Sequence, residues 1–294
     1  MKRLLFSLAA LVILISPAHS QSMWEWGDPF PLSDSVSDNC NPFLLSSYLF
    51  KNETLFLVWD RAEDSLSTAI WMDDLLDADP PQMVLSDPGV HYTHPKLMNA
   101  DYSTGDLVFH LLYQTDQNGN QDIYYISYLE DGSFTDPVAI AGEPGDDVQL
   151  SVGRIAFYDA SQNDLNYIAW INSDKLYAST LTWDAGQYFS EAVLVDSAVC
   201  HKPSVSQGQG FMGWSAPGIF YEREDSAGMH LYFAGTENNG VWTAPEVVYD
   251  STPAMNPTRM DYYGNACFSA FMDSSWKIAI HNEWGPMTVF EISK

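Results

Sequence analysis

The sequence predicts an all-β protein, a β-propeller with five four-stranded blades. Two series of short motifs recur along the 294 residues with nearly the same spacing, and the runs between them alternate aromatic or β-branched residues with polar ones. No segment beyond the first twenty residues has a convincing 3.6-residue apolar period. Repeats of this kind are typical of propellers, in which each blade buries its faces against its neighbours. A sixth, partial blade is the alternative.

The first twenty residues, MKRLLFSLAALVILISPAHS, are typical of a secretory signal peptide. Two cations precede an apolar run, and the stretch ends in Ala18, His19 and Ser20, a small-x-small set. We therefore expect an exported protein in which residues 21–294 form a single propeller domain. No later window approaches the roughly twenty apolar residues of a membrane-spanning helix, so we expect no membrane insertion.

The first motif series predicts where each blade begins. Its members are NPFLLSS, HPKLMNA, DVQLSVG, KPSVSQG and NPTRMDY, which start at Asn41, His94, Asp147, Lys202 and Asn256. These starts are separated by 53, 53, 55 and 54 residues. Proline is the second residue in four of the five. That fits an innermost strand, whose edge along the central channel can spare a hydrogen-bond donor.

The remaining strands of each unit follow in order. Runs such as ETLFLVWD and STAIWMDD, or DLVFHLLYQ and DIYYISYL, predict the second and third strands. The second motif series predicts the fourth: DPFPLSD, PPQMVLSD, DPVAIAG, EAVLVDS and APEVVYD. WEWGDPFPLSD near the N-terminus and NEWGPMTVFEIS near the C-terminus both resemble fourth strands, so one is surplus. We expect the N-terminal copy to close the ring by joining the last blade.

The charge balance restricts the class of partner. The chain has 39 acidic and 12 basic residues and a formal net charge of -27. Nucleic acid and anionic membrane surfaces carry the same sign and are disfavoured. This charge is compatible with a glycan, a protein or a cation as the ligand. It is equally compatible with an acidic surface that is only solvated.

The three cysteines, Cys40, Cys200 and Cys267, allow at most one disulfide and show no metal-type spacing.

The second unit, HPKLMNADYSTGDLVFHLLYQTDQNGNQDIYYISYLEDGSFTDPVAI, resembles the sialidase-type (BNR, Asp-box) repeats of secreted bacterial β-propellers. MHLYFAGTENNGVWTAPEVV in the fourth unit is similar. The residues that match the aspartate box are Ser127, Asp131, Gly132 and Phe134, with the Asp and Gly adjacent rather than two apart. The resemblance implies a propeller in which such boxes brace turns and do not mark catalysis.

A catalytic role is the alternative to a binding role. The resemblance implies that a sialidase would need three convergent arginines, and residues 21–294 have four: Arg61, Arg154, Arg223 and Arg259. A glycosidase needs two carboxyl groups flanking one bond. Only Asp147 among the five blade starts is acidic, although Asp101, Asp146, Glu222 or Glu224 could complete a pair. We therefore predict a non-catalytic binding module, with a glycoside hydrolase as the alternative.

The blade starts are the predicted ligand-binding site. Asn41, His94, Asp147, Lys202 and Asn256 occupy one repeat position, so their side chains are expected to gather at one mouth of the channel. The alternative is that residues before proline are simply held extended and face water.

One loop resembles part of a calcium site. Asp116, Asn118, Asn120 and Asp122 place oxygen ligands at alternate positions, as in the first half of a calcium loop. However, Gln121 replaces the glycine of the sixth position and Ser127 the acid of the twelfth. The sequence therefore favours a hairpin with Asn118 and Gly119 in its turn, with calcium as the alternative and no other cofactor expected.

Overall fold

The computed structural model divides the chain into two units, Met1–Asp38 and Asn39–Lys294. It describes residues 38–47, 54–77, 79–99, 107–142, 144–153, 167–181, 188–206, 218–226, 228–236, 241–249, 254–259, 266–272, 275–281 and 288–290. In the last four of these ranges only the backbone and the side chain of Lys277 are described. The predicted signal peptide and the predicted N-terminal strand lie outside the described residues. Within them, no helix is long and apolar enough to cross a membrane.

The second unit contains five antiparallel sheets of four strands each, joined in simple up-and-down order. This confirms the predicted all-β propeller. The strands of the first two sheets are β1 (Asn39–Ser47), β2 (Thr54–Ala62), β3 (Thr68–Asp74), β4 (Gln82–Leu85), β5 (Tyr92–Asn99), β6 (Leu107–Thr115), β7 (Asp122–Leu129) and β8 (Val138–Ala141). Those of the third and fourth are β9 (Asp147–Val152), β10 (Tyr167–Asn172), β11 (Lys175–Thr180), β12 (Val193–Asp196), β13 (Val199–Ser206), β14 (Gly218–Asp225), β15 (Gly228–Gly235) and β16 (Glu246–Tyr249). Those of the fifth are β17 (Ala254–Arg259), β18 (Ala266–Met272), β19 (Ser275–His281) and β20 (Thr288–Phe290).

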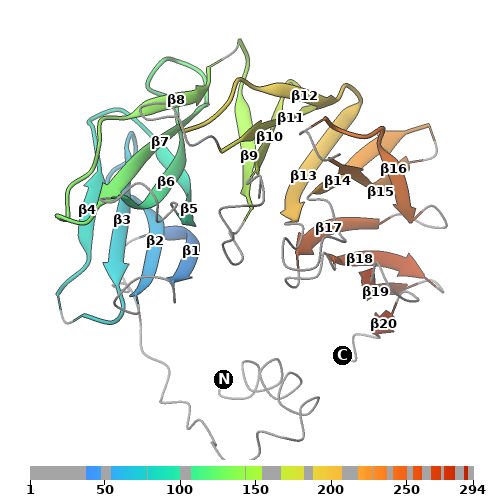
Figure 1. Ribbon diagram of the computed structural model, residues 1–294, viewed down its shortest axis with the longest axis horizontal. Helices are drawn as coiled ribbons and strands as arrows, with labels where there is room; N and C mark the ends of the chain where they lie inside the picture. The colour runs from blue at the N-terminus through green and yellow to red at the C-terminus, as the bar shows by residue number, and fades with distance from the viewer. Residues whose placement is uncertain are drawn as a thin grey trace, which may run out of the picture. The chain divides into compact units, whose positions relative to one another are not determined.

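The sheets pack against one another in chain order. One apolar cluster joins the first and second sheets, another the second and third, and a further one the third and fourth. The first strands also contact one another in succession, from β1 to β17. Figure 1 shows each sheet with its first strand toward the middle of the unit and its fourth toward the outside. The first strands are therefore the innermost ones.

Cross-strand aromatic pairs recur at one level of the sheets. Tyr113 faces Tyr124, Trp170 faces Tyr177 and Tyr221 faces Tyr232, with ring centroids 6.2, 6.2 and 6.1 Å apart. Such pairs stabilise antiparallel strands because facing side chains are close enough to pack. They account for much of the aromatic content through packing rather than ligand binding.

Every first strand has a bulge at the same place. Two of its residues lie opposite a single residue of the second strand. In four sheets the first bulge residue has a positive φ: Asn41 (47°), His94 (52°), Gln149 (58°) and Lys202 (48°). The next residue is proline in four sheets, including the fifth, because the bulge interrupts the ladder where proline cannot donate. A non-glycine residue held in this region costs about 1–2 kcal/mol, so the repeated geometry must be fixed by its surroundings.

The bulge corrects the predicted register of the third blade. Asp147 was expected to match Asn41 and His94, but the equivalent residue is Gln149, two positions later. The third unit has Leu150 where the others have proline, so its motif could be aligned only by its apolar pattern.

Candidate functional site

The bulge residues form a recurring polar position on the innermost strands. The side chains of His94, Gln149 and Lys202 are exposed, and that of Asn41 is half-buried. Asn256 occupies the same place in β17, where only the backbone is described. Equal positions on neighbouring inner strands put these groups at one level of the unit.

A buried carboxylate joins the first two of these positions. Asp60 lies near the C-terminal end of β2 and is 3% exposed. Its Oδ2 accepts hydrogen bonds from Asn41 Nδ2 and from the His94 backbone N–H, each at 2.8 Å. The left-handed backbone of His94 is thus held by the preceding sheet. Asp60 was not among the predicted site residues. Its signal in the sequence is that it follows Trp59, the aromatic residue opposite the bulge.

Two titratable groups of the second blade share this environment. Although the His94 side chain reaches the surface, partial desolvation by its neighbours lowers its pKa, and the Asp60 carboxylate opposes this shift. Burial likewise lowers the pKa of Lys96, again against the attraction of Asp60. The Lys96 ammonium also lies over the Phe43 ring, 5.1 Å from its centroid. His94 and Lys96 therefore both lie near one buried carboxylate, which favours their charged forms, while loss of solvent disfavours them.

The third and fourth sheets repeat this arrangement with other residues. The Lys202 backbone N–H donates to Gln149 Oε1 at 2.5 Å, which again joins a bulge to the preceding sheet. Lys202 Nζ lies 3.3 Å from Glu222 Oε1, and the two side chains are 49% and 5% exposed. Glu222 follows Tyr221 in β14 as Asp60 follows Trp59 in β2, so the two buried carboxylates occupy equivalent positions.

Asp147 has a different place from the one predicted. It is 1% exposed, and its Oδ1 accepts hydrogen bonds from Trp170 Nε1 at 2.8 Å and Asn172 Nδ2 at 2.9 Å. Its backbone carbonyl accepts a hydrogen bond from Gln114 Nε2 at 2.8 Å. Asp147 thus anchors β9 within its sheet and to the sheet before it, and the exposed polar position of this blade is Gln149.

The other residues weighed for catalysis have separate surroundings. Arg61 pairs with Glu63 and Arg223 with Asp196, each at 3.3 Å and each within its own part of the chain. The side chains of the other two arginines lie outside the described part. Asp146 Oδ1 accepts the backbone N–H of Gln121 at 2.9 Å.

The calcium-like loop is the hairpin between β6 and β7, with Gly119 at φ 94°. Its amides donate to its own acid: Asn118 Nδ2 lies 3.1 Å and Asn120 Nδ2 2.5 Å from the Asp122 carboxylate. Asp116 Oδ1 accepts the backbone N–H of His91 at 2.7 Å. Among the described residues no group of three or more His, Cys, Asp or Glu side chains could hold a metal ion. The geometry is therefore that of a hydrogen-bonded hairpin, and the Gln121 N–H at its end donates to Asp146 of the third blade.

The chain is similar to solved propellers. The lectin BP39L from Burkholderia pseudomallei matches over 89% of this chain and 72% of its own, with 10% identity and a TM-score of 0.57. A GH62 hydrolase in complex with xylotriose matches over 85% and 93%, with 14% identity and a TM-score of 0.48. The Aleuria aurantia lectin matches over 87% and 78%, with 14% identity and a TM-score of 0.45.

At such identities the likeness to BP39L supports the β-propeller fold alone. No family model matches the chain, and no curated protein matches it. The sialidase-type resemblance therefore stays a prediction.

Proposed function

We propose that this protein is an exported, non-catalytic binding module that takes a ligand, a glycan by preference, at the mouth of its central channel. The observation that carries the proposal is the recurring bulge, which holds polar, solvent-reaching side chains at one level of the inner strands in a strained backbone conformation. A neutral glycan suits a protein with a net charge of -27, which repels anionic polymers. The fold is also that of a lectin, BP39L.

The carboxylates at this level favour binding over hydrolysis. Asp60 and Asp147 each accept two side-chain or backbone donors, and Glu222 pairs with a lysine. Such carboxylates position strands and neighbouring side chains, whereas a general acid must present its proton to a substrate.

A glycan array with the mature protein tests the proposal. We expect specific binding by the wild type and at least a tenfold loss for the His94→Ala, Lys202→Ala double variant. Lys175→Ala, which removes an exposed lysine of the β10–β11 hairpin, is the matched control and should bind normally. Binding that is unchanged in the double variant would exclude this site, and a blank array for every variant, the wild type included, would overturn the glycan as the ligand.

A glycoside hydrolase is the second candidate, favoured by the equivalent placement of Asp60 and Glu222. Turnover of an aryl glycoside panel by the wild type, abolished in Glu222→Gln, would replace the binding proposal. Export is tested separately: the N-terminus of the secreted protein should begin after Ser20.

A further inference from the structure

A second concave site lies where the second and third sheets meet. It is a pocket of about 440 Å³ lined by residues 138–142, residues 189–192 and the side chain of Tyr125. Each segment contributes consecutive residues, whose side chains alternate in direction along a strand. The pocket is therefore lined by the backbone of these segments as well as by their side chains. The volume is within the roughly 300–1,000 Å³ typical of small-molecule sites.

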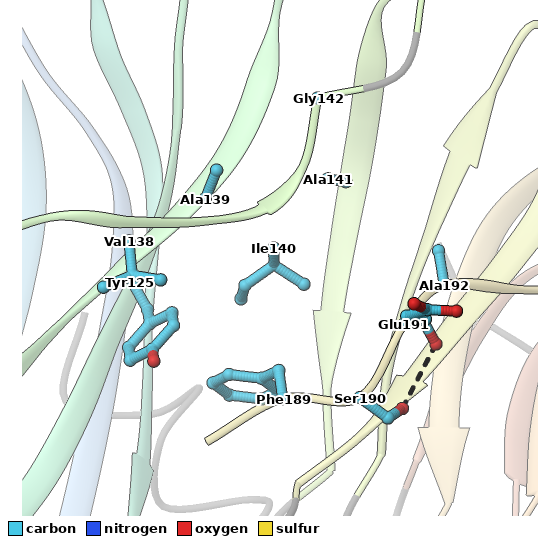
Figure 2. Close-up of a pocket in the computed structure, with 10 residues that line it drawn as sticks. All are labelled: Tyr125, Val138, Ala139, Ile140, Ala141, Gly142, Phe189, Ser190, Glu191 and Ala192. Atoms are coloured by element: carbon cyan, nitrogen blue, oxygen red, sulfur yellow. Dashed lines mark hydrogen bonds between the residues drawn. The ribbon is translucent and has the colours of Figure 1, made fainter. Parts of the chain in front are cut away.

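The lining of this pocket combines polar and apolar atoms. Figure 2 shows the side chains of Tyr125, Ile140 and Phe189 near one another, while Ala139 points away from them. Tyr125 and Phe189 are 2% and 3% exposed, and their ring centroids are 4.9 Å apart. These rings are buried by packing, so they hold the pocket in shape from beneath, and the half-buried Ile140 is the apolar side chain of the three that reaches the surface.

The polar groups lie at the rim. Glu191 is exposed, and among the described residues no donor contacts its carboxylate. The Ser190 hydroxyl is already used, since it accepts the backbone N–H of Thr180 at 3.0 Å and donates to the Glu191 carbonyl at 3.2 Å (Figure 2). β8 is the last strand of its sheet, so one edge of its backbone has no ladder partner in that sheet.

The chemistry of the lining selects among ligands. One carboxylate is too few ligands for a cation, and the described residues contain no metal-type cluster. Glu191 and the net negative charge disfavour an anion. A peptide strand would find only the four residues of β8 to pair with, and short edges are poor templates for pairing.

We propose that the pocket binds a neutral saccharide unit. The apolar face of the sugar packs against the half-buried side chains of Val138 and Ile140. Its hydroxyls donate to the Glu191 carboxylate and bond to the open edge of β8. The proposal rests on the proposed function for its ligand class, but it places that ligand at a site separate from the channel mouth.

Saturation-transfer NMR with the methyl glycosides of galactose, mannose, fucose, xylose and arabinose tests this site. We expect transfer from at least one sugar to the wild type. Glu191→Gln should weaken its binding at least about tenfold, because a charge-assisted hydrogen bond is lost, and Ala192→Trp should fill the pocket and abolish it. Glu246→Gln, the same change on exposed β16, is the matched control and should bind as the wild type.

The outcomes separate the two sites. Transfer that survives both pocket variants but is lost in the channel double variant would overturn the pocket and leave the proposed function standing. Absence of transfer from every sugar would overturn the pocket as a saccharide site, and transfer from acetyl-tetraalanine amide instead would assign it to strand pairing.

Discussion

The most unusual single residue is His110, a histidine with no exposure in the core between the second and third sheets. Its Nδ1 lies 2.9 Å from Ser127 Oγ, and the rings of Tyr125, Tyr188 and Phe189 surround it with centroids 4.8–5.8 Å away. Its Nε2 has no hydrogen-bond partner. Burial lowers the pKa of His110 to about 3, from an ordinary value of 6.5, so the ring stays neutral in the folded protein.

This residue should make stability fall in mild acid. Below pH 6.5 the unfolded chain binds a proton at His110 that the folded protein does not, so its contribution is full above pH 6.5 and decreases toward pH 3. Between pH 7 and pH 5 we expect a loss of about 2 kcal/mol from this group. Urea titrations of the wild type and His110→Gln should show a shallower pH dependence in the variant.

The matched control is His201→Gln, which removes a half-buried histidine outside this aromatic surround. Parallel pH curves for the wild type and His110→Gln would mean that His110 is protonated in the folded state.

Among the structural elements, the connection after the third strand recurs in three blades. An aromatic residue forms a bridge back to the third strand, and the hydroxyl residue after it bonds to the same strand; the pairs are Phe134 and Thr135, Phe189 and Ser190, and Trp242 and Thr243. In the fourth blade Thr243 Oγ1 accepts the Gly235 backbone N–H at 3.1 Å and Thr243 N–H donates to the Gly235 carbonyl at 2.8 Å. This element fixes where each fourth strand begins.

Removing the hydroxyl should loosen that element. Thr243→Val keeps the shape but leaves the Gly235 backbone N–H without its acceptor, so we expect a loss of about 1–2 kcal/mol in the free energy of unfolding. Thr243→Ser should restore most of it. Thermal denaturation of both variants measures the difference. A loss in Thr243→Ser with none in Thr243→Val would assign the effect to the methyl group instead.

The sequence predicted the strands because each strand carries its own pattern. The four blade starts that contain proline were located correctly in the first strands, since proline marks the bulge. The third was placed two residues early, because Leu150 gives no such signal and the acid of Asp147 resembled the polar residues of the other starts. The two donors to Asp147, the Trp170 indole and the Asn172 amide, belong to β10. The spacing of the motifs does not predict such contacts between strands.

At the scale of the whole molecule, the sheet order follows from the repeat but the sites do not. The pocket depends on how the edge of β8 faces residues 189–192 of the next blade. Asp60 reaches the backbone of His94, 34 residues away, only because adjacent sheets pack. Such relations join residues of different units, and a repeat describes each unit alone.

The packing also distinguishes the first sheet from those that follow it. Leu44, Leu97 and Val205 occupy the same position, two residues past the bulge proline. Leu97 and Val205 are each 2% exposed because they pack against the preceding sheet, whereas Leu44 is 50% exposed. The first sheet therefore presents apolar surface that its counterparts bury.

The different burial of Leu44 and Leu97 should appear as a difference in stability when each is truncated. Leu97→Ala should lower the free energy of unfolding by about 2–4 kcal/mol, since it leaves a cavity between two sheets, and Leu44→Ala by less than about 1 kcal/mol. Urea denaturation of the mature chain compares them. Equal losses would contradict the exposure of Leu44 and would mean that another part of the chain covers β1. Repeating Leu44→Ala without residues 21–37 would then identify whether the predicted N-terminal strand provides that cover, because only in that case would the cost of the substitution fall when the segment is removed.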